Sequence, residues 1–200
     1  MMTTHLETLL RVTETKGLIR ARDLAEHGIP RQYLSIACER GLLERLDRGL
    51  YSLPGAIQTE HRSLVEVCKL VPHGVICLLS ALQFHGMTTQ SPFEVWLAIG
   101  ESKETPRISL VRLRIARFSA ESLKAGVEVH DVNGAELRVF NPAKTVADCF
   151  KYRNKIGVDL ATEALRDYLR QHKGPIDDLT KYARVCRVER VMEPYLEALL

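Results

Sequence analysis

The sequence of 200 residues contains no apolar run close to the roughly 18 residues that a membrane-spanning helix needs. Its longest apolar runs, Val75–Leu79 and Val95–Ile99, have the length of single strands. The first residues also lack the pattern of a secretory signal peptide. We therefore expect a soluble protein of the cytoplasm that has no membrane partner.

Paired cysteine motifs are absent as well. None of the five cysteines forms a C-x-x-C pair, and their number is odd. Most of them fall at apolar positions of expected helices or strands, which favours buried free thiols over disulfides or metal sites. The histidines have no ligand spacing with cysteine or carboxylate side chains. We therefore predict no metal and no other cofactor.

Enzyme motifs are scarce too. The chain has no glycine-rich loop for phosphate and no nucleophile elbow. Glu101-Ser102-Lys103 follows an expected strand and resembles the end of a nuclease metal motif, but no Asp lies between Asp47 and Asp131 to complete it. The sequence thus predicts that the protein is not an enzyme, and a nuclease is the less favoured alternative.

Residues 17–53 carry the most informative pattern of the chain. Gly28-Ile29-Pro30 predicts a tight turn between two helices, because proline suits the first position of a helix. Asp47-Arg48-Gly49 predicts a hairpin turn between two strands. The expected helices and strands are, in order, Arg20–His27, Arg31–Arg40, Leu42–Leu46 and Leu50–Leu53. This order is that of a winged helix-turn-helix, whose second helix enters the major groove of double-stranded DNA.

Six side chains of this segment are candidates for DNA contacts. Those on the outer face of the second helix are Arg31, Gln32, Tyr33 and Ser35. Arg and Gln can form bidentate contacts with guanine and adenine, whereas Ser and Tyr suit phosphates. Arg45 and Arg48 belong to the wing and are expected to reach phosphates or the minor groove. The net charge of +3 is compatible with DNA binding without requiring it.

Pro54-Gly55 is the clearest candidate for a domain boundary. We expect a winged helix-turn-helix domain over residues 1–57 and an α+β domain over residues 58–200. The second domain should contain a small, mostly antiparallel sheet, with a hairpin turn at Asn133-Gly134 and a helical segment at its end. The predicted fold class of the chain is therefore α+β.

Two basic groups in the second domain are candidates for a partner surface. Arg112 and Arg114 share one face of an expected strand, Ile108–Ile115. Lys181, Arg184 and Arg187 follow one another at intervals of three residues near the end of an expected helix. Such groups can be ordinary solvated surface, or they can bind an acidic protein or nucleic acid.

Three segments of the chain resemble the AbiEi antitoxins of type IV toxin–antitoxin systems, which act in abortive phage infection. They are the wing region Arg31–Leu53, the stretch Leu79–Met87 (LSALQFHGM) and the stretch Asn141–Asp148 (NPAKTVAD). The resemblance implies a repressor that binds inverted repeats in its own promoter through the winged helix. It also implies a C-terminal domain that opposes a nucleotidyltransferase-type toxin without a stable complex. The alternative from a different class is a protein-interaction module that docks on an acidic partner.

Overall fold

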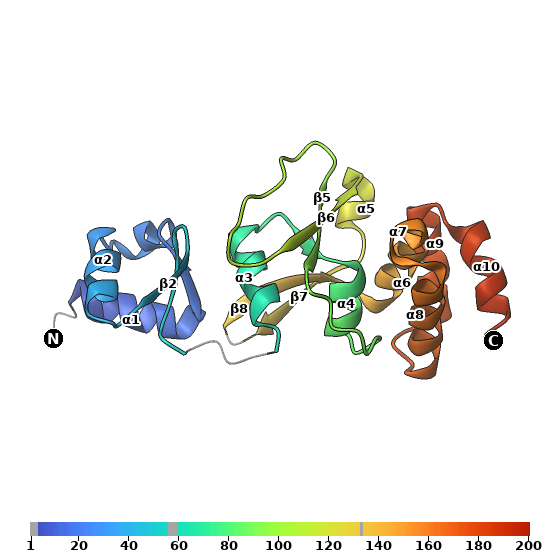
Figure 1. Ribbon diagram of the computed structural model, residues 1–200, viewed down its shortest axis with the longest axis horizontal. Coiled ribbons are helices and arrows are strands. Elements are labelled where there is room, and N and C mark those ends of the chain that lie inside the picture. The colour runs from blue at the N-terminus through green and yellow to red at the C-terminus, as the bar shows by residue number, and fades with distance from the viewer. Residues whose placement is uncertain (1–3, 56–59, 133) are drawn as a thin grey trace. The chain divides into compact units, whose positions relative to one another are not determined.

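A computed structural model describes residues 4–55, 60–132 and 134–200 (Figure 1). The chain forms two compact units, which we describe separately. The first unit contains Met1–Val71 with the segments Arg107–Val111 and Asp131–Leu137, and the second contains the rest. This division differs from one at Pro54-Gly55, so independent domains over 1–57 and 58–200 stay a prediction.

The first unit begins with the helix-turn-helix and its wing. Its helices and strands are, in order, α1 (His5–Lys16), β1 (Leu18–Arg20), η1 (Asp23–His27), α2 (Gln32–Glu39), β2 (Glu44–Asp47), β3 (Leu50–Ser52) and α3 (Arg62–Leu70). The three strands form an antiparallel sheet in the order β1-β3-β2. Thr4 caps α1 in a capping box with Glu7, because each backbone N–H bonds to the other residue's side chain.

The expected helix Arg20–His27 is wrong in its extent. Arg20 closes strand β1, which pairs with β3, and η1 is a short 3-10 helix that starts only at Asp23. The reason is tertiary, since Leu18 and Ile19 are fully buried and the pairing with β3 holds them extended. The core beneath the helices consists of Leu9, Ile19, Leu24, Ile29, Leu34, Ala37 and Leu43.

The second unit contains the carboxyl-terminal helices and most of a larger sheet. The remaining elements of the chain are β4 (Val75–Ile76), α4 (Leu78–Phe84), β5 (Val95–Gly100), β6 (Leu113–Phe118), α5 (Ala120–Lys124), β7 (Val127–Val132), β8 (Ala135–Phe140), α6 (Pro142–Lys151), α7 (Arg153–Ile156), α8 (Val158–Arg170), α9 (Ile176–Cys186) and α10 (Glu189–Glu197). The predicted α+β class with a helical C-terminal segment is confirmed.

The larger sheet has five strands in the order β6-β5-β4-β8-β7. β4 runs antiparallel to β5, and two pairs are parallel, β5 with β6 and β4 with β8. Helix α6 packs against α8, α9 and α4, and α10 packs on α9 (Figure 1). The core of the unit lies between this helical group and the sheet, around Phe140, Phe150 and Tyr168.

The expected strand Ile108–Ile115 is shifted in the structure. β6 begins at Leu113 and continues to Phe118, in register with Val95–Gly100 of β5. Buried Ala116 and Phe118 explain the shift, because the strand follows the residues that enter the core. The expected turn at Asn133-Gly134 falls on residue 133, which lies outside the described residues. No helix in the described part of the chain is long and apolar enough to span a bilayer.

Candidate nucleic-acid interface

The turn before α2 sets the direction of the predicted recognition helix. Gly28 ends η1 in the left-handed region, at φ 63°, a conformation that glycine adopts without steric cost. After Pro30, the N–H of Tyr33 donates to the Pro30 carbonyl at 3.1 Å and the N–H of Leu34 donates to the Arg31 carbonyl at 3.0 Å. The first helical turn thus forms immediately after the proline.

Burial of one face of α2 leaves the other face in solvent. Leu34 and Ala37 are buried in the core of the unit. The side chains of Arg31, Gln32 and Ser35 are exposed and make no hydrogen bond or ion pair with any other residue that the structure describes. Their donors and acceptors are therefore available for base edges and phosphates, as the sequence predicts.

Tyr33 differs from the other three candidates. It is half-buried, packs against the core, and its ring lies 5.2 Å from the ring of His5 in α1. This contact can hold the start of α2 against α1. Sequence analysis missed His5, since no signal in α1 indicates which of its exposed residues faces α2.

The wing is a twisted hairpin with an irregular register. Glu44 pairs with Ser52 and Arg45 with Tyr51, and the register shifts between Arg45 and Asp47. Such a bulge increases the local twist of a hairpin. The Ser52 hydroxyl donates to the Glu44 carboxylate at 3.1 Å, so this acid is held at the base of the wing.

Asp47 and Gly49 shape the tip of the wing. An Asp47 carboxylate oxygen accepts the Arg48 N–H at 2.6 Å, and this bond is the main reason that the pKa of Asp47 is lowered. Gly49 adopts φ 75° and closes the turn. Arg45 donates from Nε to the Asp47 carbonyl at 3.3 Å, whereas the exposed Arg48 guanidinium has no partner among the described residues. Arg48 is thus the freer of the two predicted wing cations.

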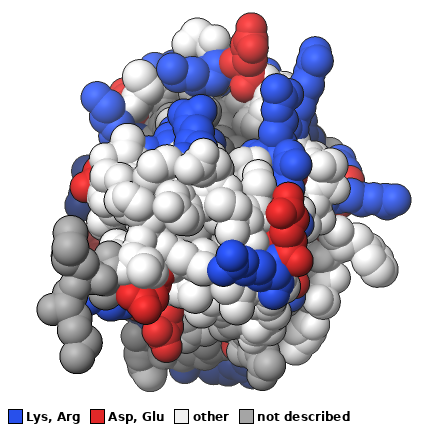
Figure 2. Space-filling view, turned by 90° about the vertical axis from the view of Figure 1, so that its left-hand side faces the viewer, with Lys and Arg blue, Asp and Glu red and all other residues white. Residues whose placement is uncertain are grey.

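Positive charge near the helix-turn-helix is dispersed. Figure 2 shows Lys and Arg side chains in several separate groups on this face, around a centre of uncharged atoms. Part of the charge is offset locally, since Arg22 Nε lies 3.7 Å from the Asp23 carboxylate. DNA binding by such a surface would depend on a few individual contacts more than on a broad region of positive potential.

The predicted basic groups of the second unit do not all offer free cations. Arg112 precedes β6, so only Arg114 lies in the strand, where its guanidinium is 3.5 Å from Glu94 and 5.0 Å from the Trp96 ring centre. On α9, Lys181 lies over the Tyr182 ring at 5.0 Å.

The last two members of the α9 group differ from each other. Arg184 donates from Nε to Glu189 at 2.7 Å, which neutralises it in place. Arg187 lies just past the end of the helix, at its left-handed C-cap, rather than on the helical face. Their role as a partner surface therefore stays a prediction.

The stretch Asn141–Asp148 forms the start of α6. Asn141 caps this helix by accepting the Lys144 N–H at 2.8 Å, and Pro142 occupies the first turn. Lys144 Nζ contacts both carboxylate oxygens of Asp148, at 2.6 and 2.7 Å, and both side chains are fully buried. The Cys186 thiol donates to the same carboxylate at 3.2 Å.

This buried ion pair has no access to solvent. Lys144 Nζ also lies 4.2 Å from the centre of the Phe140 ring and 4.9 Å from that of Phe118. Burial raises the pKa of Asp148, and the ammonium of Lys144 opposes that rise. The pair therefore organises the core of the second unit rather than a reaction centre.

The stretch Leu79–Met87 covers most of α4 and the turn that follows it. Its Ser80 hydroxyl accepts the Trp96 N–H at 3.0 Å, which fixes the helix against β5. His85 Nε2 lies 2.7 Å from the Phe140 carbonyl oxygen, and burial lowers the pKa of His85. Both contacts serve packing within the unit.

Glu101 and Lys103, the nuclease-like pair, are exposed in a turn after β5. The Arg117 guanidinium donates to the backbone carbonyls of both residues, at 2.9 and 2.7 Å, so the turn is held by its backbone. No cluster of three or more His, Cys, Asp or Glu side chains in the described ranges could hold a metal ion.

Comparison with protein families identifies the amino-terminal segment. Residues 7–54 match the model of a family described as "Transcriptional regulator, AbiEi antitoxin". The match runs from α1 past the end of β3, so it covers the helix-turn-helix and the wing. No curated protein matches the chain. The resemblance to AbiEi antitoxins is confirmed over this segment, and the stretches Leu79–Met87 and Asn141–Asp148 lie outside it.

Proposed function

We propose that the protein is a transcriptional autorepressor and antitoxin that acts in the cytoplasm and binds repeats in its own promoter through the winged helix. The observation that carries this proposal is the exposed, unpaired set Arg31, Gln32 and Ser35 at the start of α2, inside the segment that matches the AbiEi regulators. A helix with free polar side chains at its start suits the major groove.

Helix α2 and the wing have different roles in this proposal. Arg31 and Gln32 read base edges, since each can form two parallel hydrogen bonds with one base. Arg45 and Arg48 bind phosphates, which adds affinity for any sequence. One helix and one wing cover a short half-site, so two copies of the protein bind an inverted repeat.

The family description supports the antitoxin role, and we propose that the toxin belongs to the nucleotidyltransferase class. In this proposal the protein opposes the toxin without enzymatic activity of its own and without a stable complex. Exposed cations outside the winged helix, namely Arg112, Arg114, Lys181, Arg184 and Arg187, form the candidate surface. Docking of this surface on an acidic protein, with no DNA involved, is the competing function.

Electrophoretic mobility shift on the native promoter tests the DNA role. We expect binding of the promoter fragment at concentrations at least tenfold lower than those needed for a scrambled fragment of equal length. The same chain should repress a reporter that the promoter drives. Equal affinity for both fragments would contradict the repressor and favour the protein-docking alternative.

Growth rescue tests the antitoxin role separately. Cells that express the neighbouring nucleotidyltransferase gene should recover when the full chain is co-expressed. Combined Lys181→Glu and Arg184→Glu should reduce that recovery while promoter binding stays unchanged, because both residues lie on α9 outside the winged helix. Rescue that is insensitive to these changes would exclude α9 as the antitoxin surface.

A further inference from the structure

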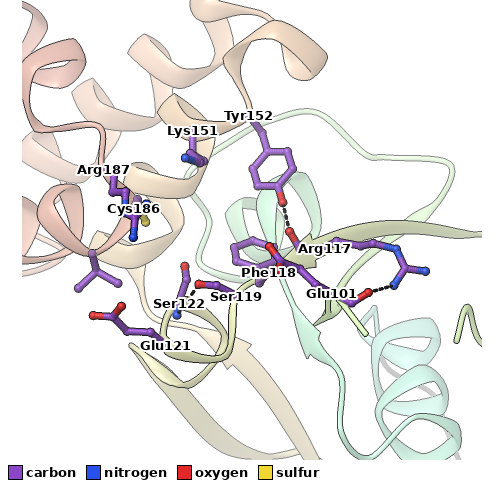
Figure 3. A pocket seen from close by; sticks show the side chains of 11 residues that line it. Glu101, Arg117, Phe118, Ser119, Glu121, Ser122, Lys151, Tyr152, Cys186 and Arg187 are labelled. Carbon is purple, nitrogen blue, oxygen red and sulfur yellow. Dashed lines mark hydrogen bonds between the residues drawn. The ribbon is translucent and has the colours of Figure 1, made fainter. Parts of the chain in front are cut away.

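A pocket of about 360 Å³ opens at the carboxyl ends of the parallel strands β5 and β6. Its walls come from Glu101 after β5, from the end of β6, from α5 and from the ends of α6 and α9 (Figure 3). The carboxyl edge of parallel strands is a frequent position for ligands in α/β sheets. The volume lies within the range of small-molecule sites.

The pocket brings three cations together from distant parts of the chain. Arg117 is fixed by hydrogen bonds to three backbone carbonyls and to the Thr105 hydroxyl, so its charge meets no carboxylate. The side chains of Lys151 and Arg187 are exposed and form no hydrogen bond or ion pair with residues in the described ranges. Two unpaired cations thus face one cavity, from the ends of two different helices.

The backbone at Arg187 is unusual for an arginine. It adopts φ 58° and ψ 42°, the left-handed conformation at a helix end that glycine normally supplies. A side chain at such a position costs conformational energy. This arginine lines the pocket together with Val185 and Cys186.

The remaining lining favours binding over covalent chemistry. Ser119 Oγ accepts the Ser122 N–H at 3.4 Å, which leaves its hydroxyl proton for a ligand. Burial raises the pKa of Cys186 to about 12, so its thiol is not an effective nucleophile. Figure 3 shows Lys151 and Tyr152 entering on one side, Cys186 and Arg187 on a second and Ser119 with Ser122 on a third.

We infer that this pocket binds a phosphate group of a small molecule. A tetrahedral oxyanion has enough oxygens to meet the Lys151 ammonium, the Arg187 guanidinium and the Ser119 hydroxyl together. Three lining cations outnumber the two lining carboxylates, Glu101 and Glu121, both of which are exposed. The cavity has room beyond one phosphate, so a phosphate ester such as a nucleoside monophosphate fits as well as free phosphate. This site is separate from the DNA-binding residues.

Isothermal titration calorimetry on the full chain, in low salt without phosphate buffer, tests the site with three probes: inorganic phosphate, adenosine 5′-monophosphate and adenosine. We expect binding of the phosphate-bearing probes and none of adenosine. Tighter binding of the nucleotide identifies an ester as the ligand class, and equal binding identifies free phosphate. No heat from either phosphate probe, or equal binding of adenosine, overturns the inference.

Variants locate the binding. Lys151→Gln and Arg187→Gln should each weaken it about tenfold, the usual effect of losing one charge-assisted contact. Arg187→Gly should weaken it equally while the melting temperature stays the same or rises, because glycine relieves the left-handed backbone. This second result separates a ligand role from a structural one.

The matched controls are Arg190→Gln, which removes a nearby exposed cation outside the pocket, and Arg48→Ala, which removes a wing phosphate contact. Both should bind the probes like the unchanged chain. Binding that falls in Arg48→Ala and persists in the pocket variants places the phosphate at the DNA interface and refutes the site. A protein that fails to bind the promoter can still bind phosphate in the pocket. The DNA-binding proposal and the phosphate-site proposal can therefore fail independently.

Discussion

The cations of the predicted DNA interface and the buried Lys144 of the second unit have opposite surroundings. In the first unit, Arg31 and Arg48 project into solvent with no described partner. In the second unit, Lys144 is fully buried against Asp148 and near two aromatic rings. An exposed cation adds little to folding and is free for recognition, whereas a buried one is tied to the packing around it. Substitutions in the two places should therefore change different measurements.

The largest expected effect is on stability, at the buried pair. Lys144→Met leaves the Asp148 carboxylate buried without its partner, and we expect a loss of about 3–5 kcal/mol in the free energy of unfolding. Denaturant unfolding can be followed by the fluorescence of Trp96, the single tryptophan, which is buried in the same unit.

The double variant Lys144→Met/Asp148→Leu is the control for that experiment. It removes both charges, so most of the lost stability should return. A single variant that unfolds like the unchanged chain would show that Asp148 finds water or another partner. Promoter binding by folded protein should stay unchanged in both variants, because neither residue belongs to the winged helix.

The sequence shows the spacing of this ion pair but does not indicate that the pair is buried. Lys144 and Asp148 stand four residues apart on a helix, a spacing that usually indicates a solvated surface pair. Burial follows from tertiary contacts, among them Gly126, where an added Cβ would lie 2.8 Å from the Lys144 Cβ. Such contacts join segments that are distant in sequence, and no local pattern shows them.

Local signals were sufficient for much of the first unit. The Thr4 capping box, the Gly28-to-Pro30 turn and the Arg48-Gly49 tip are set by neighbouring residues, so α1, the turn, α2 and the wing are found where the sequence places them. Strand β1 was missed because its three residues are extended only through pairing with β3. The pocket at Lys151 and Arg187 was missed for the same reason, since four separate segments of the sequence form it.

The next effect in size concerns specific DNA binding. Arg31→Ala and Gln32→Ala should each weaken promoter affinity by about 1–3 kcal/mol, or roughly 5- to 150-fold, because each removes a bidentate base contact. Fluorescence anisotropy with the labelled promoter measures this change. Arg11→Ala, an exposed arginine on α1, is the matched control and should bind normally. Unchanged affinity in both α2 variants would refute the assignment of the reading helix.

A smaller effect is expected at the wing tip. Arg48→Ala should weaken promoter and scrambled DNA alike and reduce the slope of log affinity against log salt by about 0.9 in magnitude, the value for one lost phosphate contact. The measurement is a salt titration of DNA affinity. A variant that loses sequence preference with its salt slope intact would indicate a base contact in the minor groove instead.

The smallest effect concerns the protonation of His85, which burial in the second unit opposes. Burial lowers the pKa of His85, whose Nε2 lies 2.7 Å from the Phe140 carbonyl oxygen. The unfolded chain therefore binds a proton more readily than the folded chain. The contribution of the neutral His85 to the free energy of unfolding is fully present above the ordinary histidine pKa of about 6.5. It is lost as the pH falls below that value. The slope for one such proton is at most about 1.4 kcal/mol per pH unit.

Unfolding free energies of the unchanged chain and of His85→Gln between pH 5 and 7.5 measure this difference. Gln keeps a donor for the Phe140 carbonyl and has no titration of its own, so His85→Gln should lose less stability toward acid. His130, whose Nε2 lies 3.0 Å from the Glu128 carboxylate, is present in both proteins. His73→Gln, which alters an exposed histidine of the same unit, should follow the unchanged chain. Equal acid dependence in all three proteins would mean that folding does not lower the pKa of His85, and that its burial does not oppose a positive charge at this position.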